Sequence, residues 1–486
     1  MLANIRPATL FQRRRTILLA ISVFFALAIF SLYRYTPPSR ISEYFPQFKT
    51  TTAADPEKHA NSVSLEELPE YNIRPYEAPY CAERFGRTYL EKLQNSTTSY
   101  CTPSSATNFT CFNNRIDDHR LDMFCFGRSA VFDAADKKFA LGCEPRALTS
   151  NETAKGTPEL TALGSYWYET GPRVIFDRSV KMDANIEARN STANYTILLK
   201  REGAYNLWHC LMEIWSMTMS LDVLRTTQDP NEKAPFFTLG DAENTQIVIL
   251  DEQDDGPYFD LWTLFAKRPV VRMKNIPEST NVENIIIPLA GASNPTWQGD
   301  WNVHSCQQSE LLHTFTHRIL DFYKIDAWAP REGDVVVTFV DRQKSRRLVD
   351  SPKYLEELKV KIPHLKIQTI DFAKLPFVEQ LKIIRETDVL VGVHGAGLTH
   401  GMFLRESSVM VEILPEGLNH KGFRNLAGLA GNTYLSTHGS KVPEPHSKRN
   451  DWHAEDVFLE KDRFINLMEV AVKSLFNTGS RSYDIN

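Results

Sequence analysis

Apolar and polar positions alternate in blocks along the C-terminal third of the chain. Short apolar runs with the composition of buried strands are separated by stretches with the periodicity of helices. The strands are expected at 334–340, 365–370, 389–391 and 408–413, and the helices at 354–361, 376–386 and 398–404. Strands that alternate with helices predict βαβ units, and therefore a parallel sheet.

The middle of the chain repeats this alternation less regularly. Strands are expected at 194–199, 246–250 and 284–287, and helices at 309–323 and at 205–224, the latter with its apolar residues near one stripe. Two successive α/β halves predict two lobes with a cleft between them, an N-terminal lobe at 81–325 and a C-terminal lobe at 326–486. A chain of 486 residues is long enough for two such domains.

A different apolar signal marks the N-terminus. Residues 16–33 form an uncharged apolar run of 18 residues, which is long enough to cross a bilayer. Four arginines precede the run and fewer follow it, so the positive-inside rule predicts a cytosolic tail at 1–15 and a lumenal remainder. A cleaved signal peptide is the alternative, although the run is longer than the apolar part of such peptides. Residues 34–80 are rich in proline and polar residues and predict a stem.

Two features typical of lumenal proteins gather in the N-terminal half. Five of the seven cysteines lie within 81–143, which predicts a segment held by disulfides. Cys210 and Cys306 can pair with each other or with the fifth cysteine, and the odd count leaves at least one thiol unpaired. Glycosylation sequons occur at Asn95, Asn108, Asn151, Asn190 and Asn194. The C-terminus lacks a KDEL-type signal, so we expect a Golgi membrane protein.

The charge balance restricts the partners. The chain has 55 basic and 60 acidic side chains and a net charge of −5. This balance argues against a protein that coats nucleic acid, and no basic low-complexity tail is present.

Two loops of the C-terminal half predict an anion site. The turn His394-Gly395-Ala396-Gly397 follows an expected strand, where glycines let the backbone approach a ligand and a helix N-terminus favours a phosphate. Arg342, Arg346 and Arg347 follow another strand and would lie at the same edge of the sheet. Together the loops predict a diphosphate site without a P-loop. Taken singly, each is also compatible with an ordinary tight turn or a solvated basic loop.

A third cluster lies on the helix expected at 205–224. Asn206, His209 and Glu213 are spaced three and four residues apart, so they can share one helix face. A histidine oriented by a carboxylate is a competent general base near neutral pH. A half-buried histidine without a chemical role is an equally good interpretation of this stretch alone.

These motifs together resemble glycosyltransferase family 61 over about residues 200–475. The similarity is carried by the stretch from Asp388 through His394-Gly-Ala-Gly397 to His400, by Asn206-x-x-His209 and by the arginine loop. The resemblance implies the GT-B architecture of two Rossmann-like lobes, a UDP-sugar donor, and inversion at the anomeric carbon. It also implies no obligatory metal or other cofactor, and the sequence contains no Asp-x-Asp triplet.

The resemblance also suggests individual roles. Nucleotide-sugar binding is assigned to a set of eight residues, in which Glu412 would bind the ribose: Asn206, Arg342, Arg346, Arg347, His394, Gly395, Gly397 and Glu412. His209 and Glu213 are the candidates for acceptor activation.

We therefore expect transfer of a sugar, xylose or N-acetylglucosamine, from a UDP-sugar to a hydroxyl of a glycan or glycoprotein in the secretory pathway. An inactive lumenal protein that binds nucleotides or glycans is the alternative. A hydrolase is disfavoured, because no serine has the G-x-S-x-G setting of a nucleophile elbow.

Overall fold

The structure is a computed structural model that describes residues 71, 78–117, 119–187, 192–277, 282–330, 332–441, 452–453, 455–477 and 482–484. The predicted membrane anchor at 16–33 and most of the predicted stem lie outside these residues. Within the described ranges, no helix combines the length and the apolar character that crossing a membrane requires.

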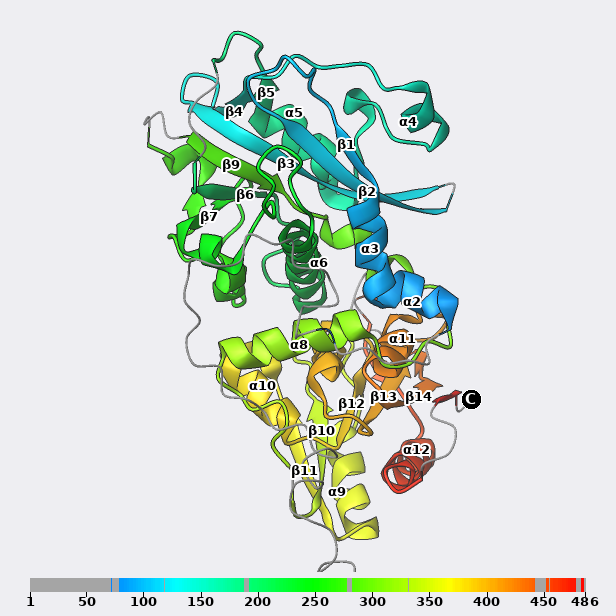
Figure 1. Ribbon diagram of the computed structural model, residues 1–486. Coiled ribbons are helices and arrows are strands. Elements are labelled where there is room, and N and C mark those ends of the chain that lie inside the picture. The colour runs from blue at the N-terminus through cyan, green and yellow to red at the C-terminus, as the bar shows by residue number, and fades with distance from the viewer. Residues whose placement is uncertain are drawn as a thin grey trace, which may run out of the picture. The chain divides into compact units, whose positions relative to one another are not determined.

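A six-stranded parallel sheet forms the C-terminal half (Figure 1). Its strand order is β11-β10-β12-β13-β14-β17, and every pairing is parallel. The strands are β10 (Val335–Val340), β11 (Leu365–Ile370), β12 (Val389–Val393), β13 (Val409–Leu414), β14 (Thr433–His438) and β17 (Ser482–Asp484). The four strands expected here from sequence are confirmed. The order reverses between β10 and β12, and such a switch point is where parallel α/β sheets bind ligands.

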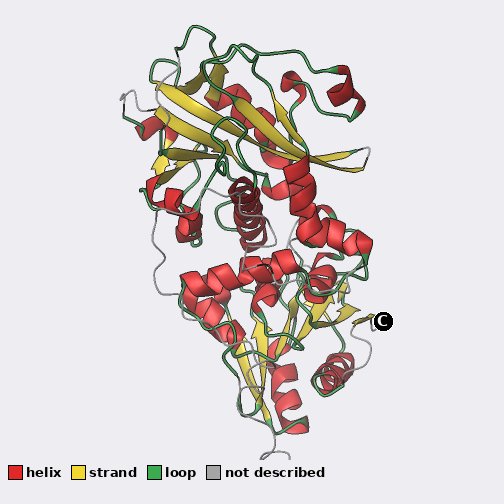
Figure 2. Ribbon diagram, in the orientation of Figure 1, coloured by secondary structure: helices red, strands yellow, loops and turns green. Residues whose placement is uncertain are grey.

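Helices cover both faces of this sheet (Figure 2). Helices α9 (Ser351–Lys361) and α12 (Lys461–Ser474) pack on one face, and α10 (Phe377–Arg385), the 3-10 helix η10 (Ala396–Phe403) and α11 (Gly422–Leu429) pack on the other. Successive side chains of a strand point to opposite faces of the sheet, so both faces of a buried strand need apolar residues. Val389 and Val391 pack on the face covered by α9 and α12, whereas Leu390 packs on the other face. The minor elements nearby are η9 (Phe372–Lys374), β15 (Ser440–Lys441) and β16 (Val457–Phe458).

The N-terminal half contains a nine-stranded mixed sheet of order β1-β2-β3-β9-β6-β7-β8, in which β4 also pairs with β3 and β5 pairs with β4. Strands β9, β6, β7 and β8 run parallel, whereas β1, β2 and β3 pair antiparallel. This half is thus Rossmann-like only in its parallel part. The strands are β1 (Thr97–Ser99), β2 (Phe109–Asp117), β3 (Arg120–Asp133), β4 (Lys138–Leu141), β5 (Val180–Met182), β6 (Tyr195–Leu199), β7 (Thr245–Ile249), β8 (Val271–Arg272) and β9 (Val282–Ile287).

The helices of this half are mostly short. They are α2 (Pro79–Phe85), α3 (Arg87–Asn95), α4 (Ser150–Ala154), η3 (Leu160–Ala162), η4 (Trp167–Glu169), α5 (Pro172–Ser179), α6 (Leu207–Thr226), η5 (Leu239–Asn244), η6 (Phe259–Phe265), η7 (Met273–Asn275), η8 (Gly291–Ser293), α7 (Pro295–Gln298) and α8 (Glu310–Phe322).

Helix α6 is the centre of the largest core. It packs on α3, η8 and η10, so all its residues except His209 are buried. The expectation of a single apolar stripe was therefore wrong for this helix. A helix that is enclosed on every side needs apolar or small residues all round.

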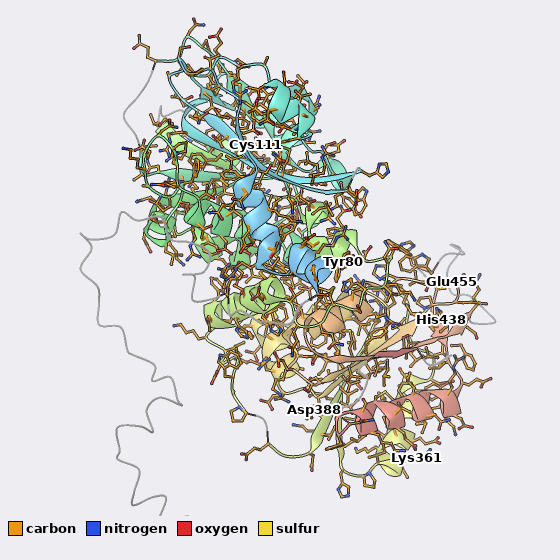
Figure 3. All side chains as sticks on the ribbon, turned by 45° about the vertical axis from the view of Figure 1, so that its right-hand side comes forward. Tyr80, Cys111, Lys361, Asp388, His438 and Glu455 are labelled. Carbon is orange, nitrogen blue, oxygen red and sulfur yellow. A yellow bond between two sulfur atoms is a disulfide. The ribbon has the colours of Figure 1, made fainter. Side chains whose placement is uncertain are left out.

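Three disulfides pair six of the seven cysteines, among them Cys111, which is labelled in Figure 3. Cys111–Cys125 links β2 to β3, and Cys101–Cys143 closes a loop nearby. Cys81–Cys306 connects α2 to the segment before α8. Cys210 is the unpaired thiol and is buried. The sequence left open whether Cys306 pairs with Cys210 or with one of the five cysteines at 81–143. The structure pairs it with Cys81, which belongs to those five.

Candidate active site

The loops on either side of the switch point carry the basic and the glycine-rich motifs. The loop 341–347 follows β10, and the turn 394–397 follows β12. A Cβ atom on Gly395 would lie 2.5 Å from Nη1 of Arg342 and 3.2 Å from Nη1 of Arg346, so both guanidiniums converge on this glycine. The φ of Gly395 is 148°, a conformation that other residues rarely adopt. The two predicted motifs therefore lie together.

These two guanidiniums form a compact, half-buried concentration of positive charge. No carboxylate forms an ion pair with Arg342 or Arg346 within the part of the chain that the structure describes. Burial and the neighbouring charge of Arg342 lower the pKa of Arg346 to about 10, and burial also lowers the pKa of Arg342. Nε of Arg346 is buried without a hydrogen-bond partner. An anion of more than one charge would satisfy this cluster.

Arg347 does not join the pair. Its Nη2 and Nε donate to Oδ2 of Asp456 at 2.6 and 3.0 Å, and its backbone N–H donates to Oδ1. The side chain is half exposed. The residue before it, Arg346, has a positive φ of 55°, so the chain turns between the two arginines and directs them apart. Arg347 thus lines a cavity of about 360 Å³ together with Arg342 and Arg346, but its charge is already paired with Asp456.

His394 is held by a buried chain of polar groups. Its Nδ1 lies 2.6 Å from Oε1 of Glu412, whose Oε2 accepts from the hydroxyl of Tyr434 at 2.6 Å. Glu412 is 0% exposed, because its position in β13 directs the side chain into the layer beneath α11 and η10. The assignment of Glu412 to the ribose is therefore corrected, since both of its oxygens already serve His394 and Tyr434.

The tautomer of His394 follows from this contact. An ionised Glu412 accepts from Nδ1–H, so the neutral ring presents Nε2 as an acceptor. Burial lowers the pKa of His394, and the hydrogen bond that His394 donates to Glu412 opposes that effect. A neutral His394 is thus suited to accept a hydrogen bond from a hydroxyl, and donates to a phosphate only when protonated.

Aromatic and histidine side chains enclose His394. The rings of His420, Phe423 and Trp452 have centroids 4.9, 5.4 and 5.5 Å from its ring. Nε2 of His420 lies 3.1 Å from Oδ2 of Asp300, which follows α7 in the N-terminal half. This contact ties the two halves together beside the candidate site.

His400, in contrast, is a buried residue with a structural role. Its ring nitrogens contact Oε1 of Gln380 at 2.6 Å and the carbonyl O of Gly397 at 2.8 Å, and its ring stacks on Phe372. Burial lowers the pKa of His400 to about 4, so the ring is neutral and fixes the turn that contains Gly397.

His209 has a carboxylate partner that the sequence analysis missed. Nδ1 of His209 lies 3.7 Å from Oε2 of Glu202, whose side chain is fully buried. Oε1 of Glu202 accepts from the backbone N–H of Ala292 at 3.0 Å. Glu202 follows β6 and Ala292 follows β9, so this pair lies at the switch point of the first sheet. Only the position of Glu202 after a strand pointed to it in the sequence.

Glu213 has a different role from the one expected. Its Oε1 accepts from the backbone N–H of Glu202 at 2.8 Å, and its Oε2 is buried without a partner. Burial and the charge of Glu202 raise the pKa of Glu213 well above its usual range. Glu213 therefore supports the backbone of Glu202 and does not orient His209.

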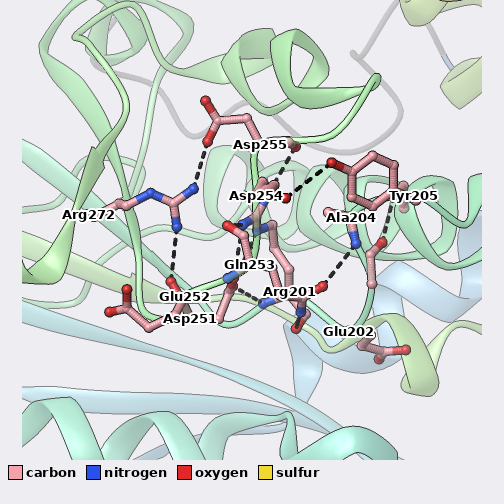
Figure 4. A network of polar contacts seen from close by, with 12 residues as sticks. Arg201, Glu202, Ala204, Tyr205, Asp251, Glu252, Gln253, Asp254, Asp255 and Arg272 are labelled. Atoms are coloured by element: carbon pink, nitrogen blue, oxygen red, sulfur yellow. Dashed lines mark hydrogen bonds and ion pairs between the residues drawn. The ribbon is translucent and has the colours of Figure 1, made fainter.

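A polar network fixes the loop that carries Glu202 (Figure 4). Arg201 is buried and donates from Nη2 and Nε to Asp251 at 2.9 and 3.2 Å, and from Nη1 to the carbonyl O of Asp254 at 2.9 Å. Gln253 donates from Nε2 to the carbonyl O of Arg201 and accepts from the N–H of Ala204. The loops after β6 and β7 are thereby held as one unit.

Asn206 begins α6. Its Oδ1 accepts from the backbone N–H of Trp208 at 3.0 Å, which is an N-cap contact. Its neighbours Tyr205 and Leu207 line a cavity of about 290 Å³ together with Arg342 and Gly397. Asn206 thus caps α6 next to residues that line this cavity, and its assignment to the nucleotide-sugar stays a prediction.

Two aromatic contacts connect the halves of the site. Trp208, next to His209, packs with its ring 5.5 Å from that of Phe423, which in turn contacts His394. The cavity beside Arg342 combines side chains from both halves, among them Tyr258 and Phe372. The cavity therefore joins the arginine loop to the start of α6, the helix that carries His209.

Comparison with known proteins finds one family match. Residues 207–411 match the model of the family described as Glycosyltransferase 61. This part of the chain is thus similar to glycosyltransferases of that family. The matched residues run from the start of α6 through β13, so the match includes His209, both arginines of the pair, His394 and the turn 395–397. The resemblance inferred from the motifs is thereby confirmed.

Curated relatives are similar to part of this chain. An EGF domain-specific O-linked N-acetylglucosamine transferase of Drosophila melanogaster is 26% identical over 299 residues, which cover 58% of this chain and 54% of the relative. Proteins of the same name from Canis lupus familiaris and Mus musculus are each 28% identical and cover 52% and 50% of the chain, and 46% and 44% of the relatives. The chain thus spans about half the length of the curated relatives it matches.

Proposed function

We propose that this chain is an inverting glycosyltransferase that moves a sugar from a UDP-sugar to a hydroxyl of a glycan or glycoprotein. The observation that carries the proposal is the pair Arg342 and Arg346, which converge on Gly395 without a carboxylate partner among the described residues. A diphosphate supplies the charge that this pair lacks. The glycosyltransferase 61 match over the same residues supports this assignment.

The leaving group is stabilised by charge. As the bond between the anomeric carbon and the diphosphate oxygen breaks, its electron pair moves to the UDP oxygen. Arg342, Arg346 and the amides at the start of η10 neutralise that developing charge. Because these groups are fixed before the reaction, transfer is proposed to proceed without a metal ion.

His209 acts as the general base. Its Nε2 removes the proton of the acceptor hydroxyl while that oxygen attacks the anomeric carbon from the face opposite UDP. Glu202 stabilises the imidazolium that forms, because its carboxylate lies beside Nδ1. His394 accepts a hydrogen bond from a hydroxyl of the donor, and Glu412 holds its ring in the required tautomer.

The donor sugar is proposed from the relatives. Those proteins are named as N-acetylglucosamine transferases, so UDP-N-acetylglucosamine is the first donor to test and UDP-xylose the second. We also propose that the protein is a single-pass Golgi membrane protein with a lumenal catalytic region. Its three disulfides and five sequons support an oxidising compartment.

Two neighbouring arginines give a matched test. In the purified full-length chain, Arg346→Met should weaken UDP binding at least tenfold, whereas Arg347→Met should leave it within twofold. His209→Ala should keep UDP affinity but lower transfer by about 10²–10⁴-fold. Titration calorimetry measures the binding, and release of UDP from each donor measures the turnover. Equal effects of the two arginine substitutions, or no binding of UDP, would refute the proposal.

The alternative of an inactive binding protein predicts another result. In that case UDP-sugars would bind to the wild-type chain, but neither transfer nor hydrolysis would exceed the background of His209→Ala.

A further inference from the structure

A short turn presents two aromatic side chains beside His209. Residues 166–170 form a hairpin-like turn in which the backbones of Tyr166 and Thr170 pair. Trp167 and Tyr168 at its tip are 52% and 55% exposed. Exposed aromatic side chains that lie together often mark a binding surface. Burying such large apolar rings would stabilise the fold, so leaving them exposed has a cost.

The turn is held in an unfavourable backbone conformation. Tyr168 and Glu169 have positive φ values of 59° and 52°, which cost free energy in residues other than glycine. Lys200 donates from Nζ to the carbonyl O of Tyr168 at 2.9 Å, and Thr170 donates from Oγ1 to the carbonyl O of Trp167 at 2.8 Å. The backbone that carries the two rings is therefore held in place.

These rings adjoin the candidate base. The ring of Tyr168 has its centroid 5.2 Å from that of His209, and the ring of Trp297 lies 4.5 Å from His209 on another side. Trp167 and Tyr168 both contact Trp297, at 6.1 and 6.4 Å. Thr170, at the base of the turn, also contacts Oε1 of Glu202 at 3.4 Å. The turn, the base and its carboxylate form one cluster.

We propose that Trp167 and Tyr168 form the acceptor subsite and bind the face of a sugar ring, so that the acceptor is a carbohydrate. This inference rests on the proposed function. The C–H face of a pyranose is apolar and slightly positive, which complements the negative face of an aromatic ring, while its hydroxyls remain free to reach His209. The sugar can belong to a free oligosaccharide or to a glycan on a protein.

The backbone of the turn favours a sugar over a peptide. A peptide bound in an extended form pairs with free main-chain groups. At this tip the carbonyl groups of Trp167, Tyr168 and Thr170 already accept hydrogen bonds from within the protein. These carbonyl groups are thus not free to pair with an extended peptide, and the charge of Glu169 at the tip is already paired with Arg178, whereas both rings are exposed.

The test separates donor chemistry from acceptor binding in the full-length chain. UDP-N-acetylglucosamine is supplied with mannotriose, xylotriose or chitotriose, or with a serine- and threonine-containing peptide. We expect transfer to at least one trisaccharide. Trp167→Ala and Tyr168→Ala should each raise the KM for that trisaccharide about tenfold, which is about 1.4 kcal/mol, with kcat and UDP affinity within twofold. Trp167→Phe, which keeps a ring, should restore most of the affinity.

Trp328→Ala is the matched control, because Trp328 is 73% exposed and contacts His317 away from this cluster. Its KM should equal that of the wild type. Transfer to the peptide alone, hydrolysis of the donor without transfer to any trisaccharide, or an unchanged KM in both alanine variants would overturn the inference while the proposed function stands. Absence of both UDP binding and donor hydrolysis would overturn the proposed function, and this inference with it.

Discussion

Removing one guanidinium from the arginine pair should stabilise the ligand-free protein and weaken UDP binding at the same time. The perturbation is Arg342→Gln. Nη1 of Arg342 and Nη1 of Arg346 lie 2.5 and 3.2 Å from the same point, a Cβ position on Gly395, so these two nitrogen atoms are at most 5.7 Å apart. At an effective dielectric constant of about 20, like charges at that distance repel each other by about 3 kcal/mol.

Removing the repulsion stabilises the ligand-free chain, but the substitution also removes a hydrogen bond made by Arg342. Nε of Arg342 donates to the carbonyl O of Ser345 at 2.9 Å, a hydrogen bond worth about 1 kcal/mol. Glutamine cannot reproduce it with the same geometry. We therefore expect the free energy of unfolding of the ligand-free chain to rise by about 1–2 kcal/mol. In the UDP complex the same substitution should be destabilising, because each charged hydrogen bond to phosphate contributes about 1.5–3 kcal/mol. UDP affinity should fall about 10- to 100-fold.

Thermal unfolding with and without UDP measures both effects on one sample. The ligand-free variant should unfold a few degrees above the wild type, and the same concentration of UDP should raise its Tm less than that of the wild type. Raising the salt concentration to about 0.5 M should reduce the difference between the ligand-free proteins, because salt screens the repulsion. Titration calorimetry gives the affinity directly.

Arg347→Gln is the control. Arg347 is paired with Asp456, so its loss should not stabilise the ligand-free chain and should leave UDP affinity near that of the wild type. Two results would refute the reasoning. One is a ligand-free Arg342→Gln that is less stable than the wild type, and the other is an unchanged affinity for UDP.

Three further predictions concern other parts of the chain. Because the pKa of Glu213 is raised, the stability that this group contributes is present at low pH and is lost as pH rises. Glu213→Gln resembles the protonated form, so its free energy of unfolding relative to the wild type should rise from pH 5 to pH 8 in denaturant titrations. Replacing Cys81 and Cys306 by serine should lower the free energy of unfolding by about 2–5 kcal/mol, measured in the same way. Gly395→Ala should cut UDP affinity at least tenfold by calorimetry, because its Cβ would displace Arg342 and strain a φ of 148°.

The sheet of the C-terminal half was predictable because buried parallel strands are apolar along their whole length. Val335–Val340 and Val409–Leu414 are such runs, and their observed bounds differ from the expected ones by one residue. The helix expected at 398–404 is instead a 3-10 helix at Ala396–Phe403, wound tightly around the glycines of the turn. The all-round burial of α6 was not predictable, because it depends on partners distant in the sequence.

The candidate site was predictable to the extent that strand ends determine it. Loops after parallel strands share an edge, so Arg346 and His394 were expected to meet. Sequence could not separate Arg346 from Arg347, because the turn at a positive φ decides which side chain joins the arginine pair. It could not assign Glu412 either, since the direction of that side chain depends on the layer packed above β13. Nothing near Glu202 in the sequence linked it to His209.

The division of the site between two sheets has a physical consequence. The positive cluster lies at the switch point of the second sheet, and His209 with Glu202 lies at that of the first. The loop of Glu202 is held by Asp251 and Gln253, whereas Arg342 and Arg346 are held by the carbonyl groups of Ser345 and His394. Substitutions in one network should therefore leave the other intact. If the two roles are separate, His209→Ala combined with Arg346→Met will lose UDP affinity to the same extent as Arg346→Met alone, because additivity holds for sites that share no partners.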